Sequence, residues 1–216
     1  MENDLLRQSA KTLAGKINHH TRKEGLELTK MELGAEVFLI NTSKIIIIYL
    51  LAALLGILLQ TLTIHSAFAL LKRYSFGLHA LNSTVCTLVS CFMFVAVPLL
   101  LTLGNVGIGN YGVIIIFSAI NLILFCYAPA DTKARPIIGA HRRKRFKQKA
   151  VASAIFLMAV ALLIPNESIK LLLTVGAVYQ SISVLPFTYK ILNRSVRNYE
   201  IYEGHGRVEL EGNAHS

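Results

Sequence analysis

The order of apolar and polar residues along the chain predicts a protein built from helices that cross a membrane. Long apolar runs separated by polar connections cover about residues 45–71, 81–103, 107–127, 150–164 and 169–187. Runs of this kind are typical of membrane-spanning helices. Two of the connections, GNVG and PNES, are short and contain turn-forming residues. We therefore predict an all-α, polytopic membrane protein.

The residues before the first apolar run predict amphipathic helices. Apolar residues recur at helical spacing between basic ones, first at Leu6, Ala10, Leu13 and Ile17 and again over residues 24–40. Such helices lie in the surface of a membrane. The polar residues at 41–43 then offer a start for the first membrane helix. Within one domain of residues 1–216, we predict amphipathic segments over 1–43, membrane helices over 44–190 and a polar tail over 191–216.

The first apolar run has an unusual length. Its 27 residues, 45–71, make about 40 Å of helix, whereas two full crossings need roughly 20 residues each. The charge pattern described next nevertheless places both of its ends on the same side of the membrane. We predict a tight hairpin or a re-entrant pair that breaks between Gly56 and Thr63, and about six membrane helices in total, the first two short.

Basic residues decide the predicted orientation of these helices. The chain carries 22 Lys and Arg against 12 Asp and Glu, a net charge of +10, while 54% of its residues are hydrophobic. Seven of the basic residues lie in 1–44, eight in 129–149 and four from 190 onward. This placement beside apolar runs follows the positive-inside rule and argues against a nucleic-acid partner. Both termini are therefore predicted to be cytoplasmic.

One stretch between two apolar runs, RYSFGLHALNSTVC from Arg73 to Cys86, carries candidate chemistry. Residues 82–84 are helix-capping types, so Cys86 falls in or near the first turn of a helix, where the helix dipole favours a thiolate. If the chain turns at this cap, His79 reaches the sulfur and forms a nucleophile and base pair. A packing role for Cys86 and an interfacial role for His79 remain open alternatives. Cys91 and Cys126 are interpreted as packing residues.

Other residues near this pair have predicted supporting roles. Gly77 allows the backbone to bend or to approach a bound peptide closely, and the free N–H groups near Ser83 and Thr84 are candidate oxyanion donors. Three polar residues are candidates for orienting His79: Gln60, Asn82 and Asp131. Each of them can also serve as a helix cap, a turn residue or a contact between helices. Three cysteines without a CxxC pair, and histidines without metal-ligand grouping, predict no disulfide framework, metal or cofactor.

The stretch also resembles a known family. Gly77, His79, Ala80 and Cys86, with Arg73 and Tyr74 before them, resemble the motif of the accessory gene regulator protein B (AgrB) family of bacterial membrane endopeptidases. The loop APADTKARPI at 128–137 and the basic run HRRKRFKQK at 141–149 are similar to that family as well. One position departs, because Phe76 stands where the family motif has a second small residue.

The resemblance implies an activity and a setting. Proteins of this family cut the C-terminal tail from a small AgrD propeptide and join the new carboxyl end to an internal cysteine, which gives the thiolactone of a quorum-sensing signal. Carried over to matching positions, Cys86 is the nucleophile and His79 the general base. The resemblance also implies an AgrD-like propeptide as substrate, a bacterial cell membrane as location and a homodimer as assembly.

A group of basic residues has two interpretations that can hold together. They define topology and bind anionic lipid headgroups, or they dock the acidic tail of the propeptide. The residues are Lys133, Arg135, Arg142, Arg143, Lys144 and Arg145.

Two other classes of protein compete with the enzyme. A small transporter or peptide exporter needs polar residues in several membrane helices, and beyond Asn121 and Gln180 the later helices offer few. A scaffold leaves the His79 and Cys86 pair unexplained.

Overall fold

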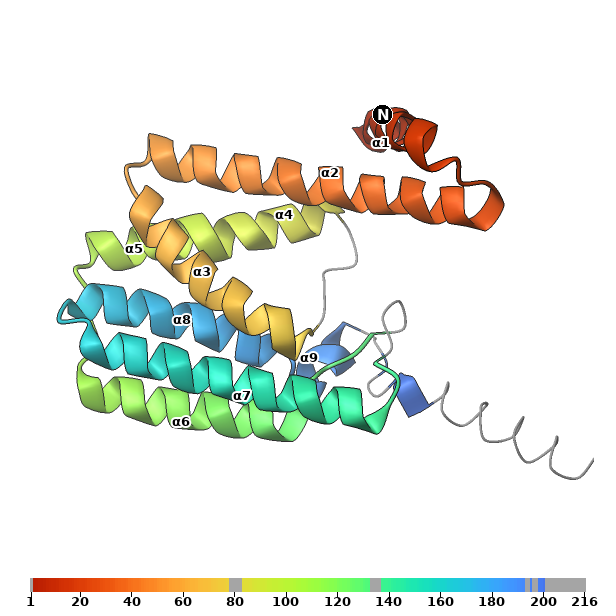
Figure 1. Ribbon diagram of the computed structural model, residues 1–216. Coiled ribbons are helices and arrows are strands. Elements are labelled where there is room, and N and C mark those ends of the chain that lie inside the picture. Colours follow the sequence, from red (N-terminus) through yellow and green to blue (C-terminus); the bar gives the residue numbers. More distant parts are fainter. Residues whose placement is uncertain (1, 78–82, 133–136, 193–194, 196–197, 201–216) are drawn as a thin grey trace, which may run out of the picture. The chain divides into compact units, whose positions relative to one another are not determined.

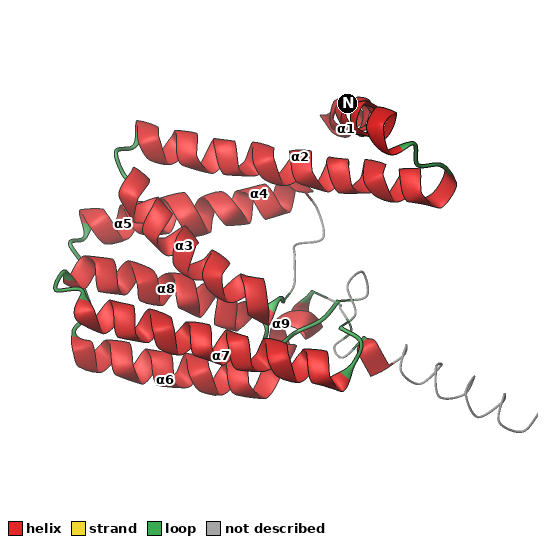
Figure 2. Ribbon diagram, viewed as in Figure 1, coloured by secondary structure: helices red, strands yellow, loops and turns green. Residues whose placement is uncertain are grey.

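The computed structural model describes residues 2–77, 83–132, 137–192, 195 and 198–200. These residues are mainly helical, and no strand occurs among them, so the all-α prediction is confirmed (Figures 1 and 2). The helices form two compact units, Met1–Gly56 and Ile57–Ser216, and each is described by itself. The helices are α1 Glu2–Thr21, α2 Gly25–Leu54, α3 Leu58–Ser75, α4 Ser83–Cys91, α5 Val97–Leu103, α6 Asn110–Tyr127, α7 Ala140–Leu163, α8 Glu167–Ser183 and α9 Pro186–Ile191, with a π-helical turn, η1, at Phe92–Ala96.

The first unit consists of α1 and α2, which pack through small residues. Ala10 and Ala14 of α1 are buried against Ala35 of α2, whereas Ile17 is exposed. The predicted helix start at residues 41–43 is wrong, because α2 continues through it without a break. The Ser43 hydroxyl donates to the Ile40 carbonyl 2.9 Å away and so bonds inside the helix, as serine can in a helix interior. The second amphipathic segment and the first apolar run therefore share one helix.

The predicted break in the first apolar run is confirmed, and it lies at the N-terminal end of the predicted range, at Gly56. Helix α2 ends at Leu54, Gly56 has a φ of +70°, and α3 begins at Leu58. The predicted count of about six membrane helices is not confirmed. By length and composition, four described helices can cross a membrane: α2, the continuous helix Thr84–Leu103, α6 and α7. Helix α8 is shorter, with 17 residues, and both α3 and α8 carry buried polar side chains, among them Thr61 and Ser75 of α3 and Gln180 of α8.

In the second unit, α3 and α8 form the tightest contact, and α6, α7 and α8 pack side by side (Figure 1). A Cβ on Gly176 of α8 would lie 2.3 Å from the Ile64 carbonyl oxygen of α3. Only glycine therefore allows the two backbones to approach this closely. Around the contact lie Leu71, Phe117, Leu124 and Ala177, all fully buried. This packing holds the C-terminal end of α3, which leads to the candidate site, against α8.

A hydrogen bond from Thr61 of α3 compensates for the backbone donor that Pro98 of α5 lacks. Proline has no N–H, so Pro98 cannot donate to the Phe94 carbonyl four residues earlier. The chain forms the wider turn η1 here, where the Val97 N–H bonds to the Phe92 carbonyl. The Thr61 hydroxyl donates to the Phe94 carbonyl at 2.7 Å and replaces the missing donor. A threonine that interrupts an apolar run in the sequence is thus a buried contact between helices.

We expect Thr61→Val to lower the melting temperature of the purified protein in detergent. The substitution keeps the shape of the side chain but leaves the buried Phe94 carbonyl unpaired, which costs about 1–3 kcal/mol. Thr63→Val is the matched control, because the Thr63 hydroxyl bonds only to Leu59 within its own helix. Equal melting temperatures for the two variants would contradict the assigned role of Thr61.

Candidate functional site

Cys86 occupies the beginning of α4. It is the fourth residue of that helix, in the turn where the sequence places it, and its thiol is free. The helix exposes an apolar stripe, with Val85 50%, Leu88 65% and Phe92 61% exposed, a surface suited to lipid. Cys86 and Ser90, four residues apart, are only half-buried and lie on another face. Cys86 therefore lies at the edge of the exposed apolar surface, three residues before Val89, which is also exposed.

A lysine that the sequence did not single out acts on this thiol. Lys72 follows the apolar run of α3 and lies outside it, and its ammonium interacts electrostatically with Cys86. Burial lowers the pKa of Lys72 to about 8, and the negative charge of an ionised Cys86 opposes this shift. The Lys72 ammonium is therefore close enough to Cys86 for the two groups to interact. A cation beside a cysteine at a helix start is the setting in which thiols become nucleophilic.

The end of α3 is joined to the loop after α6 by two backbone hydrogen bonds. The Gly77 N–H donates to the Ala130 carbonyl at 3.0 Å, and the Ala130 N–H donates to the Ser75 carbonyl at 2.9 Å. Phe76 and Ala130 thereby form a parallel bridge. The two motifs that carry the family resemblance, one before His79 and one at residues 128–137, are thus in direct contact. We call this contact, Ser75–Gly77 with Ala130, the junction.

Two residues of the junction have left-handed backbone conformations. Phe76 has φ 59° and ψ −120°, a geometry that glycine favours and that costs a residue with a side chain about 1–3 kcal/mol. This is the position where the family motif has a small residue. Gly77 has φ +95°, and a Cβ there would lie 2.6 Å from the Ser183 hydroxyl. The packing of α8 therefore requires a glycine at position 77, independently of whether a peptide binds there.

Asp131 closes the other side of the junction. Its carboxylate is 4% exposed and accepts hydrogen bonds from the backbone N–H groups of Asn198 at 3.0 Å and Tyr199 at 2.8 Å. The Tyr189 hydroxyl donates to the Asp131 carbonyl at 2.9 Å. Asp131 therefore anchors the C-terminal segment, which weakens its candidacy as the group that orients His79. We call this set of bonds the Asp131 latch.

The predicted basic residues divide into separate groups. Arg143 has a structural role, because it donates to the Ile137 carbonyl at 3.2 Å and stacks 3.8 Å from the Tyr199 ring. The other three on α7 are exposed, and we call Arg142, Lys144 and Arg145 the exposed basic cluster. Arg142 also lies over the ring of Phe146 in its own helix, 5.8 Å from the centroid. Cations near the start of a helix oppose its dipole, so the dipole does not account for these three charges.

The remaining residues of the predicted site differ in whether the structure describes them. His79, Lys133 and Arg135 lie outside the described residues, as does Asn82. Ser83 and Thr84 are the first two residues of α4, where unpaired N–H groups occur. Gln60 is half-buried on α3. The described chain therefore brings together Lys72, Cys86 and the junction, whereas the relation of His79 to them remains a prediction from sequence.

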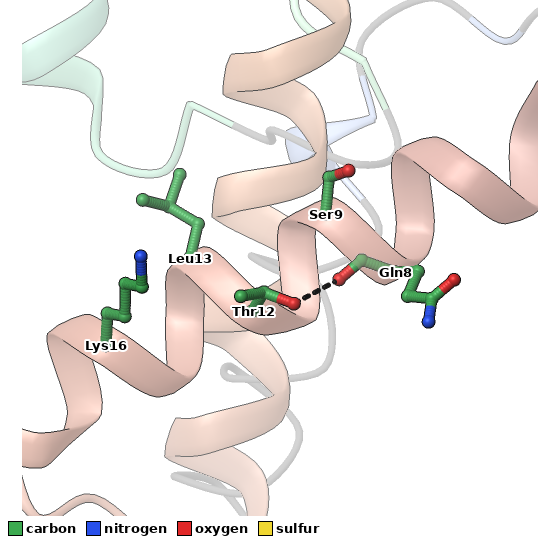
Figure 3. Close-up of a pocket in the computed structure, with 5 residues that line it drawn as sticks. All are labelled: Gln8, Ser9, Thr12, Leu13 and Lys16. Atoms are coloured by element: carbon green, nitrogen blue, oxygen red, sulfur yellow. Dashed lines mark hydrogen bonds between the residues drawn. The ribbon is translucent and has the colours of Figure 1, made fainter.

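Elsewhere the described surface offers little chemistry. A hollow on α1 is lined by residues of that one helix, and its one drawn hydrogen bond, from the Thr12 hydroxyl to the Gln8 carbonyl at 2.9 Å, lies within the helix (Figure 3). Among the described residues, no group of three His, Cys, Asp or Glu side chains could hold a metal ion. Cys91 is half-buried, and Cys126 is exposed on α6 rather than packed. The candidate site therefore remains the region of Cys86.

Known proteins match this chain over most of its length. The family model for accessory gene regulator B matches residues 10–184. An AgrB-like protein of Clostridium acetobutylicum is 40% identical over 202 residues, which cover 94% of this chain and 96% of that protein. An AgrB-like protein of Listeria innocua is 45% identical over 174 residues, 81% of this chain and 84% of its own.

Accessory gene regulator protein B of Staphylococcus intermedius is 34% identical over 182 residues, which cover 84% of this chain and 95% of that protein. No solved structure matches. The matched range contains Cys86, the junction and the loop at 128–132 that bears the Asp131 latch. The chain therefore belongs to the accessory gene regulator B family.

Proposed function

We propose that this protein is a membrane cysteine endopeptidase that cuts the C-terminal tail from an AgrD-like propeptide and closes the remaining peptide into a thiolactone. The observation that carries the proposal is the setting of Cys86. Its thiol is free and half-buried at the beginning of α4, and it interacts with the Lys72 ammonium. Family membership supports a role in propeptide processing.

The first half of the reaction cleaves a peptide bond. His79 takes the proton of the Cys86 thiol, and the sulfur attacks the carbonyl carbon of the scissile bond. The unpaired N–H groups at the start of α4, near Ser83 and Thr84, stabilise the oxyanion that forms. His79 then gives its proton to the leaving nitrogen. The tail departs with a new amino terminus, and the propeptide remains bound to Cys86 as a thioester.

The second half closes the ring. The internal cysteine of the propeptide loses its thiol proton and attacks the thioester carbonyl, while the departing Cys86 sulfur takes up a proton. One thioester replaces another, so the step has little free-energy cost and needs no ATP. Attack by water on the same thioester would be strongly downhill. The half-buried position of Cys86 in a membrane protein limits the access of water.

The exposed basic cluster supports a site for the acidic tail of the propeptide. We expect the triple variant Arg142→Gln, Lys144→Gln and Arg145→Gln to raise the KM for the propeptide by about tenfold at low salt, with kcat little changed. Each lost long-range attraction contributes about 0.3–1 kcal/mol and is screened by salt. The measurement is tail release at two salt concentrations.

The control for the triple variant is a propeptide whose acidic tail residues are replaced by their amides. The triple substitution should not affect the KM of that neutral substrate. An equal rise in KM for both substrates would assign the cluster to lipid binding or topology instead. Arg143 is kept unchanged in this experiment, because its contacts with Ile137 and Tyr199 are structural.

The test of the proposed function is a reaction in liposomes of the purified protein with its cognate propeptide, followed by mass spectrometry. We expect three species: the free tail, a covalent adduct on the peptide that contains Cys86, and a ring lighter than the linear cleaved peptide by one water. Unchanged propeptide on the far side of the liposome membrane would indicate a transporter. Unchanged propeptide on the near side only would leave a scaffold.

A further inference from the structure

Gln180 of α8 is a buried residue whose side-chain amide donates hydrogen bonds to the end of α3. It is 0% exposed. Its side-chain nitrogen donates to the Ser75 hydroxyl at 2.7 Å and to the Phe76 carbonyl at 2.6 Å. Its side-chain oxygen has no hydrogen-bond partner among the described residues. A buried amide with one unpaired oxygen is a costly way to fill a core, so stability alone does not explain Gln180.

The Phe76 carbonyl that Gln180 binds belongs to the strained residue of the junction. The peptide after it is held from the other side, because the Gly77 N–H donates to the Ala130 carbonyl at 3.0 Å. The Phe76 ring is also fixed, at 5.0 Å from the ring of Phe146. A strained conformation persists only where its surroundings impose it. The hydrogen bond from Gln180 is one of the contacts that impose it.

One turn further along α8, Ser183 completes the contact. Its hydroxyl donates to the Gln180 carbonyl at 2.9 Å, and its atoms close the space in which a Gly77 Cβ would stand. Helix α8 thus holds two consecutive residues of the junction, Phe76 by a hydrogen bond and Gly77 by packing. His79 follows Gly77 by two positions in the sequence.

We propose that Gln180 is a positioning residue of the peptidase. It locks the Phe76 peptide in its strained conformation and so sets the direction in which the chain leaves α3 toward His79. The inference rests on the proposed function, because direction matters only where His79 must meet a substrate. A positioning residue acts on the chemical step, since a misplacement of about 1 Å can cost about 100-fold in rate.

The first variant, Gln180→Leu, removes the amide and keeps a side chain of similar size. We expect kcat for tail release to fall by about 100-fold while the KM for the propeptide changes little. Thr174→Val is the matched control. Thr174 is also buried on α8, but its hydroxyl bonds to the Lys170 carbonyl of its own helix at 2.8 Å. This control should keep the kcat of the parent.

The second variant, Gln180→Glu, keeps the shape and makes the contact depend on pH. An ionised carboxylate cannot donate to the Phe76 carbonyl, whereas the protonated acid can. Burial raises the pKa of a carboxyl group, so protonation occurs within the working range of pH. We expect the ratio of kcat for this variant to kcat for the parent to rise as the pH falls. A core residue without a positioning role would give a flat ratio.

Separate results would overturn the two proposals. If Gln180→Leu folds and keeps the kcat of the parent, or if the ratio for Gln180→Glu is flat, the positioning role is wrong and the peptidase stands. If the parent itself releases no tail, the peptidase proposal fails and the positioning role fails with it. If Gln180→Leu does not fold, the pH dependence of Gln180→Glu decides.

Discussion

Cys86→Ala should release no tail and form no adduct, with a loss of at least about 10⁴-fold in the rate of tail release. The size follows from the mechanism, because no other group in the proposed reaction can form the thioester. Its fold should survive, since the thiol is half-buried and free of a disulfide. The rate is measured in liposomes by mass spectrometry of the tail, and folding by the melting temperature in detergent.

The other two cysteines supply the matched controls for Cys86→Ala. Cys91 lies five residues after Cys86 in α4 and is half-buried. Cys126 is exposed on α6. Cys91→Ala and Cys126→Ala should each release the tail at the rate of the parent. If Cys86→Ala still cuts the propeptide, the thiol is a packing residue and the enzyme proposal fails at its centre.

His79→Ala should lower the rate of tail release by about 10²–10⁴-fold, the contribution of a general acid and base. The effect is smaller than that of Cys86→Ala because the nucleophilic sulfur of Cys86 is still present. The reactivity of Cys86 toward iodoacetamide, read by mass spectrometry, should fall as well, because His79 takes the thiol proton in the proposed mechanism. Added imidazole should restore part of the activity, since it can carry the proton that the side chain no longer carries.

The control for His79→Ala is His141→Ala, which removes an exposed histidine at the start of α7. It should leave tail release unchanged. If His79→Ala cuts at the parent rate, His79 is an interfacial residue and another group must supply the base. If Cys86 keeps the reactivity of the parent toward iodoacetamide while tail release falls, His79 acts on the leaving group rather than on the thiol.

The sequence predicted the parts of the fold that depend on local pattern. The break after α2 was predictable because Gly56 interrupts an apolar run, and the start of α4 because residues 82–84 are capping types. The continuity of α2 through residues 41–43 was not predictable. Polar residues there bond within the helix, as Ser43 does, and a sequence does not distinguish this arrangement from a cap. The membrane count differed because α8 has only 17 residues and α3 carries polar side chains among its apolar ones.

The candidate site shows the same limit at longer range. Cys86 and Gly77 stand out in the sequence because cysteine and glycine have distinctive chemistry and backbone freedom. Gln180 does not, because its partners Ser75 and Phe76 lie 105 and 104 residues away in the chain. Lys72 does not stand out in the sequence either, and only the arrangement of α3 and α4 brings it to Cys86. Contacts of this separation follow from the packing of whole helices.

The Asp131 latch has a consequence for the order in which the protein matures. During synthesis, Asn198 is added 67 residues after Asp131. At about 5–20 residues per second, this interval lasts several seconds. Until then the carboxylate has no backbone amides to bind and must stay in contact with water. The loop that bears Ala130 and Asp131 therefore settles late, after the helices that surround it have been made. The support that Asp131 gives to the C-terminal segment is therefore completed only once Asn198 and Tyr199 have been added to the growing chain.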